Sequence, residues 1–532
     1  MTNYDEVPYP NLSHVQSHPD SVATLALLLG LRPAPVEQCR VLEIGCAMGG
    51  NLLPMAQGLP GSTFVGIDYS AVQIEAGQQA LKALGLDNTR LLHLDIMDVT
   101  PELGEFDYII AHGVYSWVLE PVRDRLMVIC QQNLAPNGLA YVSYNVYPGW
   151  HMLGSLREMM LYHIRELTVP AERAAQARSL LNFLAESVPT ADKGRATLLN
   201  AYSAFLKQEM ARIGPKSDSF LLHDELEDIN HPVYFHEFVA HAEGHGLQFV
   251  SEVEFRSALP NFYPKETAEA VMKTARSVVD MEQYLDFLRT RTFRQTILCH
   301  QGLEVNRTLK PESMAPLHIA SRAVPEADDP DLNARSIEKF KSIDGAVFSI
   351  DHPVSKAAMV QLAVNWPRTL PFDDLLNAAL ARLNRASPNG PVQLKPDDAY
   401  VLQSNLLKAF VYSDYLVEAH IWPPAFTVEI SERPEASPWA RYQAQFDGKV
   451  TNLRHERVEL DELNRWLIPY VDGTRTFGDL MEVLLAGPVA GGTLVAQEDD
   501  QPLTDPARIR EVLGAELREN LKWLARAALL VG

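Results

Sequence analysis

The chain has 532 residues, more than one hydrophobic core usually supports, so we expect two to four domains. Hydrophobic residues make up 47% and charged residues 21%, and no apolar run is long enough to cross a membrane. The formal net charge of −22 would repel a phosphate backbone, which argues against a nucleic acid partner. An acidic N-terminus and four scattered cysteines without a CxxC pair indicate a cytoplasmic protein with reduced thiols.

Short apolar runs alternate with helical patterns through the first third of the chain. A helix-like run at 22–29 ends at Gly30 and precedes the first strand. Five strands buried on both faces are predicted at 41–44, 64–67, 91–94, 108–111 and 139–142. This alternation predicts an α/β fold with a parallel, doubly wound sheet, whose ligands lie beyond the carboxyl ends of the strands.

The rest of the chain predicts an insertion, two more strands and two further units. Residues 157–230 are helical and polar, whereas 231–302 contains a helix at 235–246 and strands at 247–253 and 293–299 that complete a seven-stranded sheet. A Pro-rich, acidic stretch at 325–331 indicates an exposed boundary or loop. The expected domains are a core at 1–156, the insertion at 157–230, the completion of the core at 231–302, a middle domain at 303–395 and a C-terminal domain at 396–532. Their expected elements are a strand at 346–350, helices at 357–364, 372–383, 461–470, 477–485 and 509–530, and a loop at 387–390.

The first strand leads into a turn rich in small residues, Glu43-Ile44-Gly45-Cys46-Ala47-Met48-Gly49-Gly50-Asn51. Small residues let the backbone approach a ligand closely. The spacing differs from the GxGxxG fingerprint, so no pyrophosphate is implied and NAD is only the second candidate cofactor. The turn resembles the glycine motif of class I methyltransferases, in which Gly45 to Gly49 would border the amino acid part of S-adenosylmethionine. Ala47 stands where that motif usually has a central glycine, and a turn that merely joins a strand to a helix is the alternative.

The ends of the next strands carry acids in the order that this fold requires. Asp68 ends the second strand, where its carboxylate can accept hydrogen bonds from both hydroxyls of a ribose. Asp95 ends the third strand and can accept from an adenine amino group, while Ile96 packs on the ring. Each acid alone is more often a solvated strand-end or helix-capping residue; together they predict S-adenosylmethionine as the cofactor. The predicted cofactor-binding residues are Glu43, Gly45, Cys46, Ala47, Gly49, Asn51, Asp68, Tyr69, Ser70, Asp95, Ile96, His112 and Gly113.

Two aromatic segments, 111–118 and 143–151, follow the fourth and fifth strands and are expected to hold the methyl acceptor. Methyl transfer is an in-line displacement, so the protein mainly has to desolvate and aim the acceptor, and aromatic faces tolerate a nearby positive charge. A lysine acceptor costs about 4 kcal/mol to hold neutral near pH 7.4, and burial can supply this. Aromatic side chains such as Tyr147 and Trp150 are just as typical of core or interface anchors. The predicted catalytic residues, which orient the amine or wall its pocket, are Tyr144, Asn145, His112, Tyr115, Trp117, Tyr147 and Trp150.

Several histidines raise the question of a metal site. His241 and His245 have the i, i+4 spacing of one helix face, with His231 and His236 nearby. No cysteine joins them and no HExxH pattern is present, so we predict no metal. His14 and its neighbours precede the first strand and are expected to form a lid over the cofactor.

Three segments, 111–118, 143–151 and 232–238, resemble bacterial methyltransferases that carry a methyltransferase regulatory domain. The best-known members that the chain resembles are the rickettsial outer-membrane-protein lysine methyltransferases. The resemblance spans nearly the whole chain and is strongest up to His300. It implies a Rossmann-like methyltransferase core, a homodimer formed through the helical insertion, a middle domain and a winged-helix-like C-terminal domain. It also implies a protein lysine as the acceptor, on an outer-membrane or surface protein before export.

Three functions remain open at this point. The first is a protein lysine N-methyltransferase, and the second is a small-molecule N- or O-methyltransferase that uses the same cofactor. The third is a regulatory protein that binds S-adenosylmethionine without turnover. Labelled methyl groups found only in small molecules would remove the first, and release of S-adenosylhomocysteine on an acceptor would remove the third.

Overall fold

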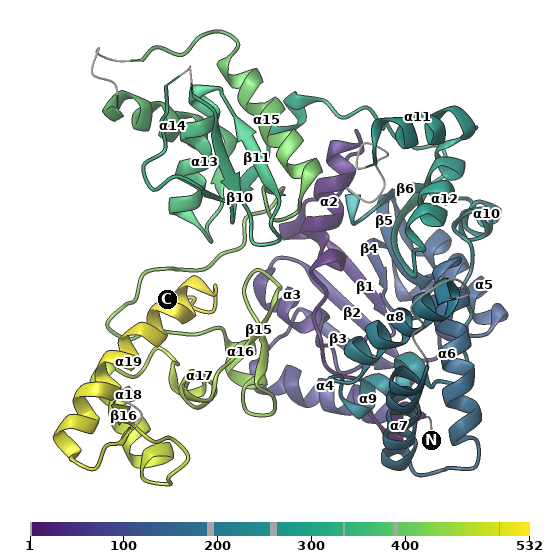
Figure 1. Ribbon diagram of the computed structural model, residues 1–532, viewed down its shortest axis with the longest axis horizontal. Coiled ribbons are helices and arrows are strands. Elements are labelled where there is room, and N and C mark those ends of the chain that lie inside the picture. Colours follow the sequence, from purple (N-terminus) through teal and green to yellow (C-terminus); the bar gives the residue numbers. More distant parts are fainter. Residues whose placement is uncertain (1–2, 189–195, 256–262, 334–335, 387–391, 499–500) are drawn as a thin grey trace.

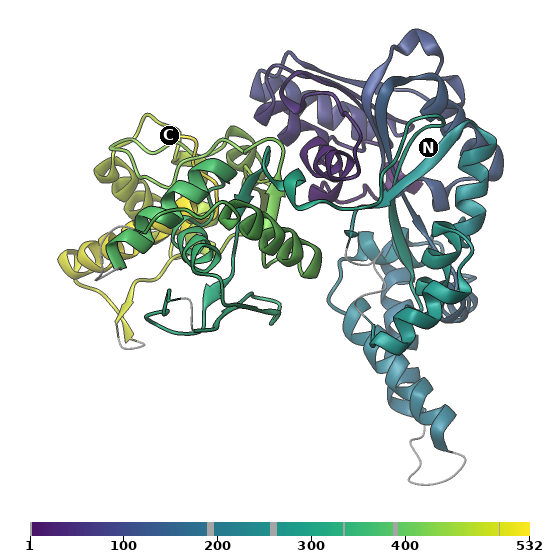
Figure 2. The ribbon, with the colours of Figure 1, turned by 90° about the horizontal axis from the view of Figure 1, so that it is seen from above.

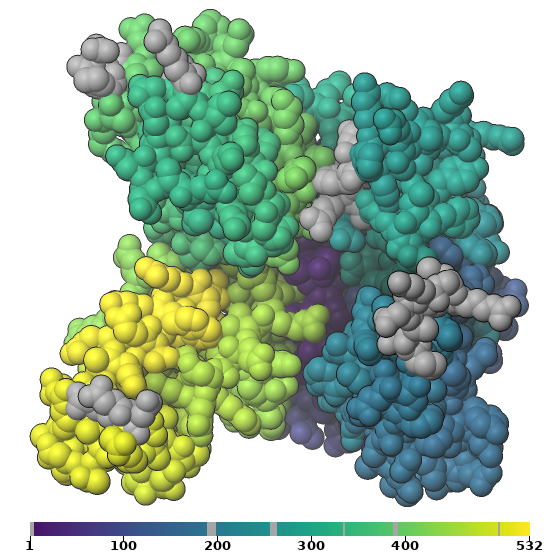
Figure 3. Space-filling model, in the orientation of Figure 1, coloured from purple at the N-terminus to yellow at the C-terminus, as the bar shows by residue number. Residues whose placement is uncertain are grey.

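The computed structural model describes residues 3–188, 196–255, 263–333, 336–386, 392–498 and 501–532. The chain forms four lobes (Figure 1), and the N-terminal residues lie between them in the space-filling view of Figure 3. The expected loop at 387–390 lies outside the described residues. Among the helices that the structure describes, none is both long and apolar enough to cross a membrane.

A seven-stranded sheet forms the centre of the larger half of the molecule, with the strand order β3-β2-β1-β4-β5-β7-β6. Strands β1 to β5 run parallel to one another, and β7 runs antiparallel to both β5 and β6. The predicted Rossmann-like α/β class is therefore confirmed, with a mixed sheet. The strands are β1 Arg40–Ile44, β2 Thr63–Asp68, β3 Thr89–His93, β4 Phe106–Ala111, β5 Leu134–Asn145, β6 Leu247–Glu252 and β7 Phe293–His300.

Helices cover both faces of this sheet. One face packs on α2 Pro19–Leu28, α3 Leu52–Gly58 and α4 Ala71–Leu84, and the other on α5 Glu120–Gln132 and α10 Phe235–Gly244. Successive residues of a strand point to opposite faces, so they pack in different cores. Tyr108 and Tyr141 pack in the core under α2, α3 and α4, whereas Ile109 and Tyr144 pack in the core under α5 and α10. Burying a large apolar side chain completely stabilises the folded state by roughly 1.5–3 kcal/mol relative to leaving it exposed.

Strand β5 is longer than the expected 139–142 and includes the first residues of the second aromatic segment. Tyr144 pairs with Arg294 and Asn145 with Phe293 on β7, so residues 143–145 are strand and not loop. The reason is tertiary, because the antiparallel β7 supplies backbone partners that the local sequence does not reveal. Two neighbouring residues of a strand point to opposite faces, so Tyr144 and Asn145 cannot share one pocket.

The insertion forms a helical arm with its own core, seen projecting from the sheet in Figure 2. Its members are α6 Gly149–Ile164, α7 Pro170–Ser187, α8 Ala196–Ile213 and α9 Asp218–Phe220. Leu156, Leu181 and Leu206 are among its buried residues. Along the chain, helices α11 Lys265–Thr274 and α12 Val278–Arg289 follow β6 and precede β7.

The middle unit contains the three-stranded sheet β11-β10-β9 and three helices, α13 Pro353–Asn365, α14 Phe372–Ala386 and α15 Asp398–Tyr412. We expected the C-terminal domain to begin at residue 396, but Leu402 and Leu406 of α15 pack in the same core as α13 and α14. The short strands here are β8 His318–Ala320, β9 Val324–Pro325, β10 Glu338–Lys341, β11 Val347–Ile350, β12 Leu370–Pro371 and β13 Glu418–His420.

The C-terminal unit has a separate core built on its last helix. That helix, α19, ends at Arg526 and not near 530, because Ala528 takes a left-handed φ of 55° and Leu530 bridges to Ala436. The other elements are α16 Pro438–Gln443, β14 Lys449–Thr451, β15 Arg457–Glu459, α17 Glu462–Leu467, α18 Phe477–Leu484, β16 Gln497–Glu498, β17 Gln501–Pro502 and α19 Pro506–Arg526.

Candidate active site

A cavity of about 1140 Å³ lies beyond the carboxyl ends of the parallel strands. Its walls come from four parts of the chain that are far apart in sequence. They are the strand ends, the N-terminal residues Tyr9 to Gln16, the helical arm and Arg457 of the C-terminal unit. The position is the one that a doubly wound sheet offers to a ligand.

The glycine-rich turn is held to β2 by its own backbone. The N–H groups of Gly45 and Cys46 donate to the carbonyl of Ile67 at 2.9 and 3.0 Å, and that of Ala47 donates to Asp68 Oδ2 at 2.8 Å. Ala47 takes a left-handed φ of 49°, which costs an alanine about 1 kcal/mol. The turn therefore keeps the backbone of the glycine motif although its central residue is alanine.

Asp68 connects the ends of β1 and β2. Besides Ala47, the Ser70 N–H donates to its other oxygen, Oδ1, at 2.8 Å. Burial raises the pKa of the Asp68 carboxyl above its ordinary value, and the backbone hydrogen bonds act in the opposite direction. Ala47 and Ser70 donate to different oxygens, and a carboxylate offers about four acceptor positions, so acceptor capacity remains for a ligand.

Glu43 is the most deeply buried acid of the cavity wall. Its Oε1 accepts a hydrogen bond from Asn51 Nδ2 at 2.7 Å, and burial raises the pKa of its carboxyl to about 8. Among the described residues, Glu43 Oε2 has no hydrogen-bond partner. A buried acceptor without a partner is costly, which indicates a ligand donor at this position.

His112 forms the wall between the glycine turn and the aromatic segments. Its Nδ1 is hydrogen-bonded to the Tyr141 hydroxyl at 2.8 Å, and its ring stacks on His14 with 3.6 Å between centroids. Burial, with a smaller effect from the charge of Arg457, lowers the pKa of His112 to about 4. The ring is therefore neutral at physiological pH.

Part of the cavity wall is aromatic and also carries an amide. Trp117, Trp150 and Phe293 line it together with Asn145. The Asn145 backbone N–H donates to Ser116 Oγ at 2.8 Å and its Nδ2 donates to Asn230 Oδ1 at 3.0 Å. These two bonds fix the amide, and none of the hydrogen bonds found among the described residues uses its Oδ1.

The structure brings most of the predicted site residues together. Twelve of the thirteen predicted cofactor residues line the cavity. The exception is Gly49, where a Cβ would come within 2.9 Å of Leu53 Cγ, so its small size serves packing. Four predicted catalytic residues also line the cavity: His112, Trp117, Asn145 and Trp150.

Three predicted tyrosines do not line the cavity, which corrects the expected catalytic set. Tyr144 is hydrogen-bonded to Thr296 Oγ1 at 2.9 Å and stacks on Phe238 within the core. Tyr115 is buried in the same core. Tyr147 stacks on His151 with 4.1 Å between ring centroids. Strand alternation directs Tyr144 to the opposite face of the sheet from Asn145.

Several lining residues were not predicted from the sequence. The N-terminal segment was expected over the cofactor only through His14, which lines the cavity; it also approaches the turn so closely that a Cβ on Gly50 would lie 2.1 Å from Asn11 Oδ1. Phe293 and Arg212 come from elements more than 150 residues after the turn. No local pattern distinguishes these residues or Arg457, because only the tertiary fold brings them here.

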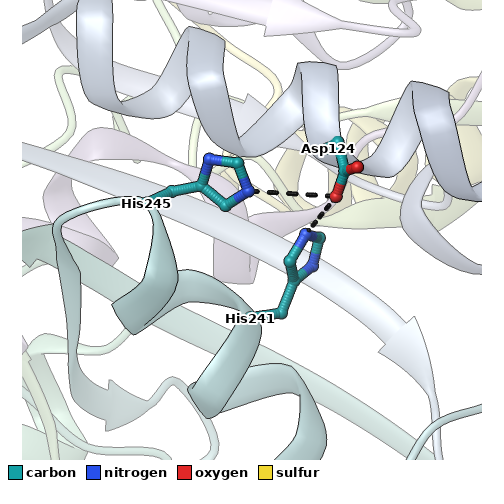
Figure 4. A group of neighbouring side chains, drawn as sticks. All are labelled: Asp124, His241 and His245. Carbon is teal, nitrogen blue, oxygen red and sulfur yellow. Dashed lines mark hydrogen bonds and ion pairs between the residues drawn. The ribbon is translucent and has the colours of Figure 1, made fainter.

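Asp124, His241 and His245 form a small cluster away from the cavity (Figure 4). One potential ligand atom from each lies within 4.8 Å of the others. Asp124 Oδ1 already lies 2.7 Å from His241 Nε2, and its side chain is 55% exposed. An exposed ion pair explains this arrangement without a metal, so we keep the prediction of no metal site.

The fold and the site together define a class I S-adenosylmethionine-dependent methyltransferase. Three family models match in chain order: a methyltransferase domain over 42–140, a predicted methyltransferase regulatory domain over 217–300, and the PKMT C-terminal winged helix domain over 432–529. The uncharacterized protein RP789 of Rickettsia prowazekii is 33% identical, covering 99% of this chain and 93% of that protein.

The solved structure of PKMT2 from Rickettsia typhi matches with a TM-score of 0.86 at 28% identity, covering 99% of this chain and 100% of the other. A second structure of PKMT2, in complex with AdoHcy, matches equally well. This chain therefore belongs to the family of methyltransferases that combine a methyltransferase regulatory domain with a PKMT winged helix domain.

Proposed function

We propose that this protein transfers a methyl group from S-adenosylmethionine to a lysine side chain of a protein substrate. The observation that carries the proposal is that Trp117, Trp150 and Asn145 line the same cavity as the glycine turn. The whole-chain similarity to PKMT2 and the resemblance to the rickettsial lysine methyltransferases support a lysine acceptor.

The residues of the cofactor end suit S-adenosylmethionine. Glu43 Oε2 is a buried acceptor without a partner among the described residues, which suits the ammonium of the methionine part. Asp68 has free acceptor positions for the ribose hydroxyls. Asp95 and Ile96 also line the cavity, where they can bind the adenine. The bound cofactor supplies an electrophilic methyl carbon on a sulfonium.

The acceptor end holds the amine and excludes water. Trp117 and Trp150 give apolar walls that favour the neutral amine over the ammonium form. Asn145 Oδ1 accepts a hydrogen bond from the amine and so aims its lone pair. In the transfer, the nitrogen–carbon bond forms as the sulfur–carbon bond breaks, and the positive charge passes from sulfur to nitrogen.

His112 contributes through its lack of charge. With a pKa of about 4 it cannot hold a proton taken from the lysine, so that proton leaves to solvent before the attack. A neutral ring also adds no positive charge beside a sulfonium. His112 is thus a wall of the site, oriented by Tyr141, and not its general base.

The proposal is tested by incubating the purified protein with methyl-labelled S-adenosylmethionine and an extract of bacterial envelope proteins. Tandem mass spectrometry should then find the label on lysine side chains, and Asp68→Ala should abolish it. Label confined to the small-molecule fraction would contradict the proposal and favour a small-molecule acceptor.

We further propose a homodimer formed through the helical arm. Large apolar side chains are exposed on the arm: Tyr162 69%, Val169 55%, Phe183 60%, Leu198 80% and Leu199 42%. Such a concentration on one lobe is typical of an interface. Light scattering should give a dimer for the wild type and a monomer for Phe183→Glu/Leu198→Glu. Met272→Glu, which adds one such negative charge at a 60% exposed residue outside the arm, should stay dimeric. A monomeric wild type would contradict the proposal.

A further inference from the structure

The hairpin of β14 and β15 in the winged-helix region lies against the glycine turn. His455, at its tip, donates from Nε2 to Asn51 Oδ1 at 2.8 Å, and Thr451 Oγ1 donates to Ser13 Oγ at 3.2 Å. Both hydrogen bonds are buried. The C-terminal unit therefore touches the turn and the N-terminal segment that border the cavity.

Helix α16 holds this unit in place. Trp439 is fully buried in the hydrophobic cluster that also contains side chains of α3 and α4. Its backbone N–H donates to Gln57 Oε1 at 2.7 Å, and Gln57 Nε2 donates to Ser437 Oγ at 3.0 Å. A buried tryptophan and two hydrogen bonds fix the unit on α3, so the hairpin is not a freely moving loop.

The cations of the cavity wall differ in how they are paired. Arg212 lies 2.7 Å from Glu209 and 2.8 Å from Glu225, and Lys216 lies 3.7 Å from Asp224. The third is Arg457, whose guanidinium has no hydrogen bond or ion pair to any residue that the structure describes. Thus Arg457 is the one basic side chain of the described wall that is left for an anionic ligand group.

The cofactor carries one such group. Its methionine part has a carboxylate beside an ammonium and a sulfonium, and the cavity wall offers Glu43 to the ammonium. The carboxylate needs a cation, and the planar fork of arginine matches it in a bidentate manner. The charge of Arg457 already acts on His112 and His14 beside the glycine turn.

We propose that Arg457 of the winged-helix domain binds the carboxylate of the methionine part of the cofactor, so that this domain completes the cofactor site. The inference rests on the proposed function, because it takes S-adenosylmethionine as the ligand. It gives the C-terminal domain a role in cofactor binding and couples its docking to the occupancy of the cavity.

Titration calorimetry on the full chain with two ligands tests this role. S-adenosylhomocysteine contains the carboxylate, whereas 5′-methylthioadenosine keeps the nucleoside and lacks the amino acid part. Arg457→Ala should weaken binding of S-adenosylhomocysteine about tenfold, because the lost interaction lies between an exposed ion pair and a buried charged hydrogen bond in strength. The affinity for 5′-methylthioadenosine should stay within about twofold of wild type. Arg457→Lys should fall between wild type and Arg457→Ala. Lys449→Ala removes an exposed cation of the same hairpin outside the cavity wall and should change neither affinity.

The outcomes separate this inference from the proposed function. Equal weakening of both ligands by Arg457→Ala, or unchanged binding of S-adenosylhomocysteine, would overturn the role of Arg457 while the cofactor assignment stands. A wild type that binds neither ligand would overturn the cofactor assignment, and the inference with it.

Discussion

The cofactor end and the acceptor end of the cavity are assembled in different ways. The cofactor end comes mainly from residues 43–113, where consecutive parallel strands end side by side. The acceptor end joins Trp117 and Asn145 to Phe293, a residue almost 150 positions later that arrives on the antiparallel β7. One half of the site is thus set by local strand endings and the other by a long-range strand pairing.

The two ends also differ in charge. Three acids, Glu43, Asp68 and Asp95, line the cofactor end, which suits a ligand with an ammonium, ribose hydroxyls and an adenine amino group. The acceptor end presents tryptophans, an amide and a histidine whose pKa of about 4 keeps it neutral. This difference predicts that substitutions at the first end change affinity, whereas those at the second change turnover.

The largest effect is expected for Asp68→Ala at the cofactor end. The substitution removes the acceptor of the Ala47 and Ser70 N–H groups together with both positions offered to the ribose. Charged hydrogen bonds contribute about 1.5–3 kcal/mol each, so affinity for S-adenosylhomocysteine should fall more than about 100-fold. Calorimetry measures this, with Asp87→Ala at an exposed turn as control. Unchanged binding would show that the assignment of Asp68 is wrong.

The second largest effect is expected for Asn145→Ala, and it distinguishes Asn145 from its neighbour Tyr144 on β5. Asn145→Ala should lower kcat about 100-fold, because a misaimed acceptor loses the near-attack geometry, while cofactor affinity stays within about threefold. Tyr144→Phe is its matched control, since it removes only the buried hydrogen bond to Thr296. That control should lose about 1 kcal/mol of unfolding free energy and keep its turnover.

Steady-state kinetics, calorimetry and thermal unfolding on both variants check this contrast. If Tyr144→Phe lost turnover and Asn145→Ala did not, the assignment of the acceptor to the Asn145 face of β5 would be refuted.

The smallest predicted effect is a pH dependence of cofactor affinity that arises from Glu43. Its pKa of about 8 in the unliganded protein means that the carboxyl is mostly protonated at pH 6 to 7. An ammonium beside Oε2 favours the charged form and lowers this pKa, so binding releases a proton. Affinity for S-adenosylhomocysteine should therefore rise about tenfold from pH 6 to 8 and level off above.

Glu43→Gln serves as the control for this pH dependence, because it keeps the bond to Asn51 and cannot titrate. Calorimetry across the pH range should give it weaker binding and a flatter profile. An identical slope in both proteins would assign the titration to another group.

The sequence identified most of the residues that gather at the cofactor end, because the information for this is local. Strand endings at Asp68 and Asp95 and the small residues of the glycine turn are readable within a few positions, and parallel strands must bring such endings together. Even there, the contact of Asn11 with Gly50 was not predicted, since it depends on how the N-terminal segment folds back.

The acceptor end was predicted only in part, for a physical reason. The aromatic segments were found, but the direction of each side chain depends on where β5 ends, and β7 extends β5 to Asn145. Once residues 143–145 belong to the strand, their side chains alternate between the two faces of the sheet. Tyr144 was therefore assigned to the pocket from its segment, although its ring belongs to the core on the other face.

The proposed function requires a single ligand at the tips of β1, β2, β3 and β4, with its sulfur facing Asn145 and Trp117. A crystal structure of the protein with S-adenosylhomocysteine tests this directly. We predict the ribose on Asp68, the adenine beside Asp95 and Ile96, and the methionine part between Glu43 and Arg457. A bound nucleoside elsewhere on the protein, with these strand tips left uncontacted, would contradict the account.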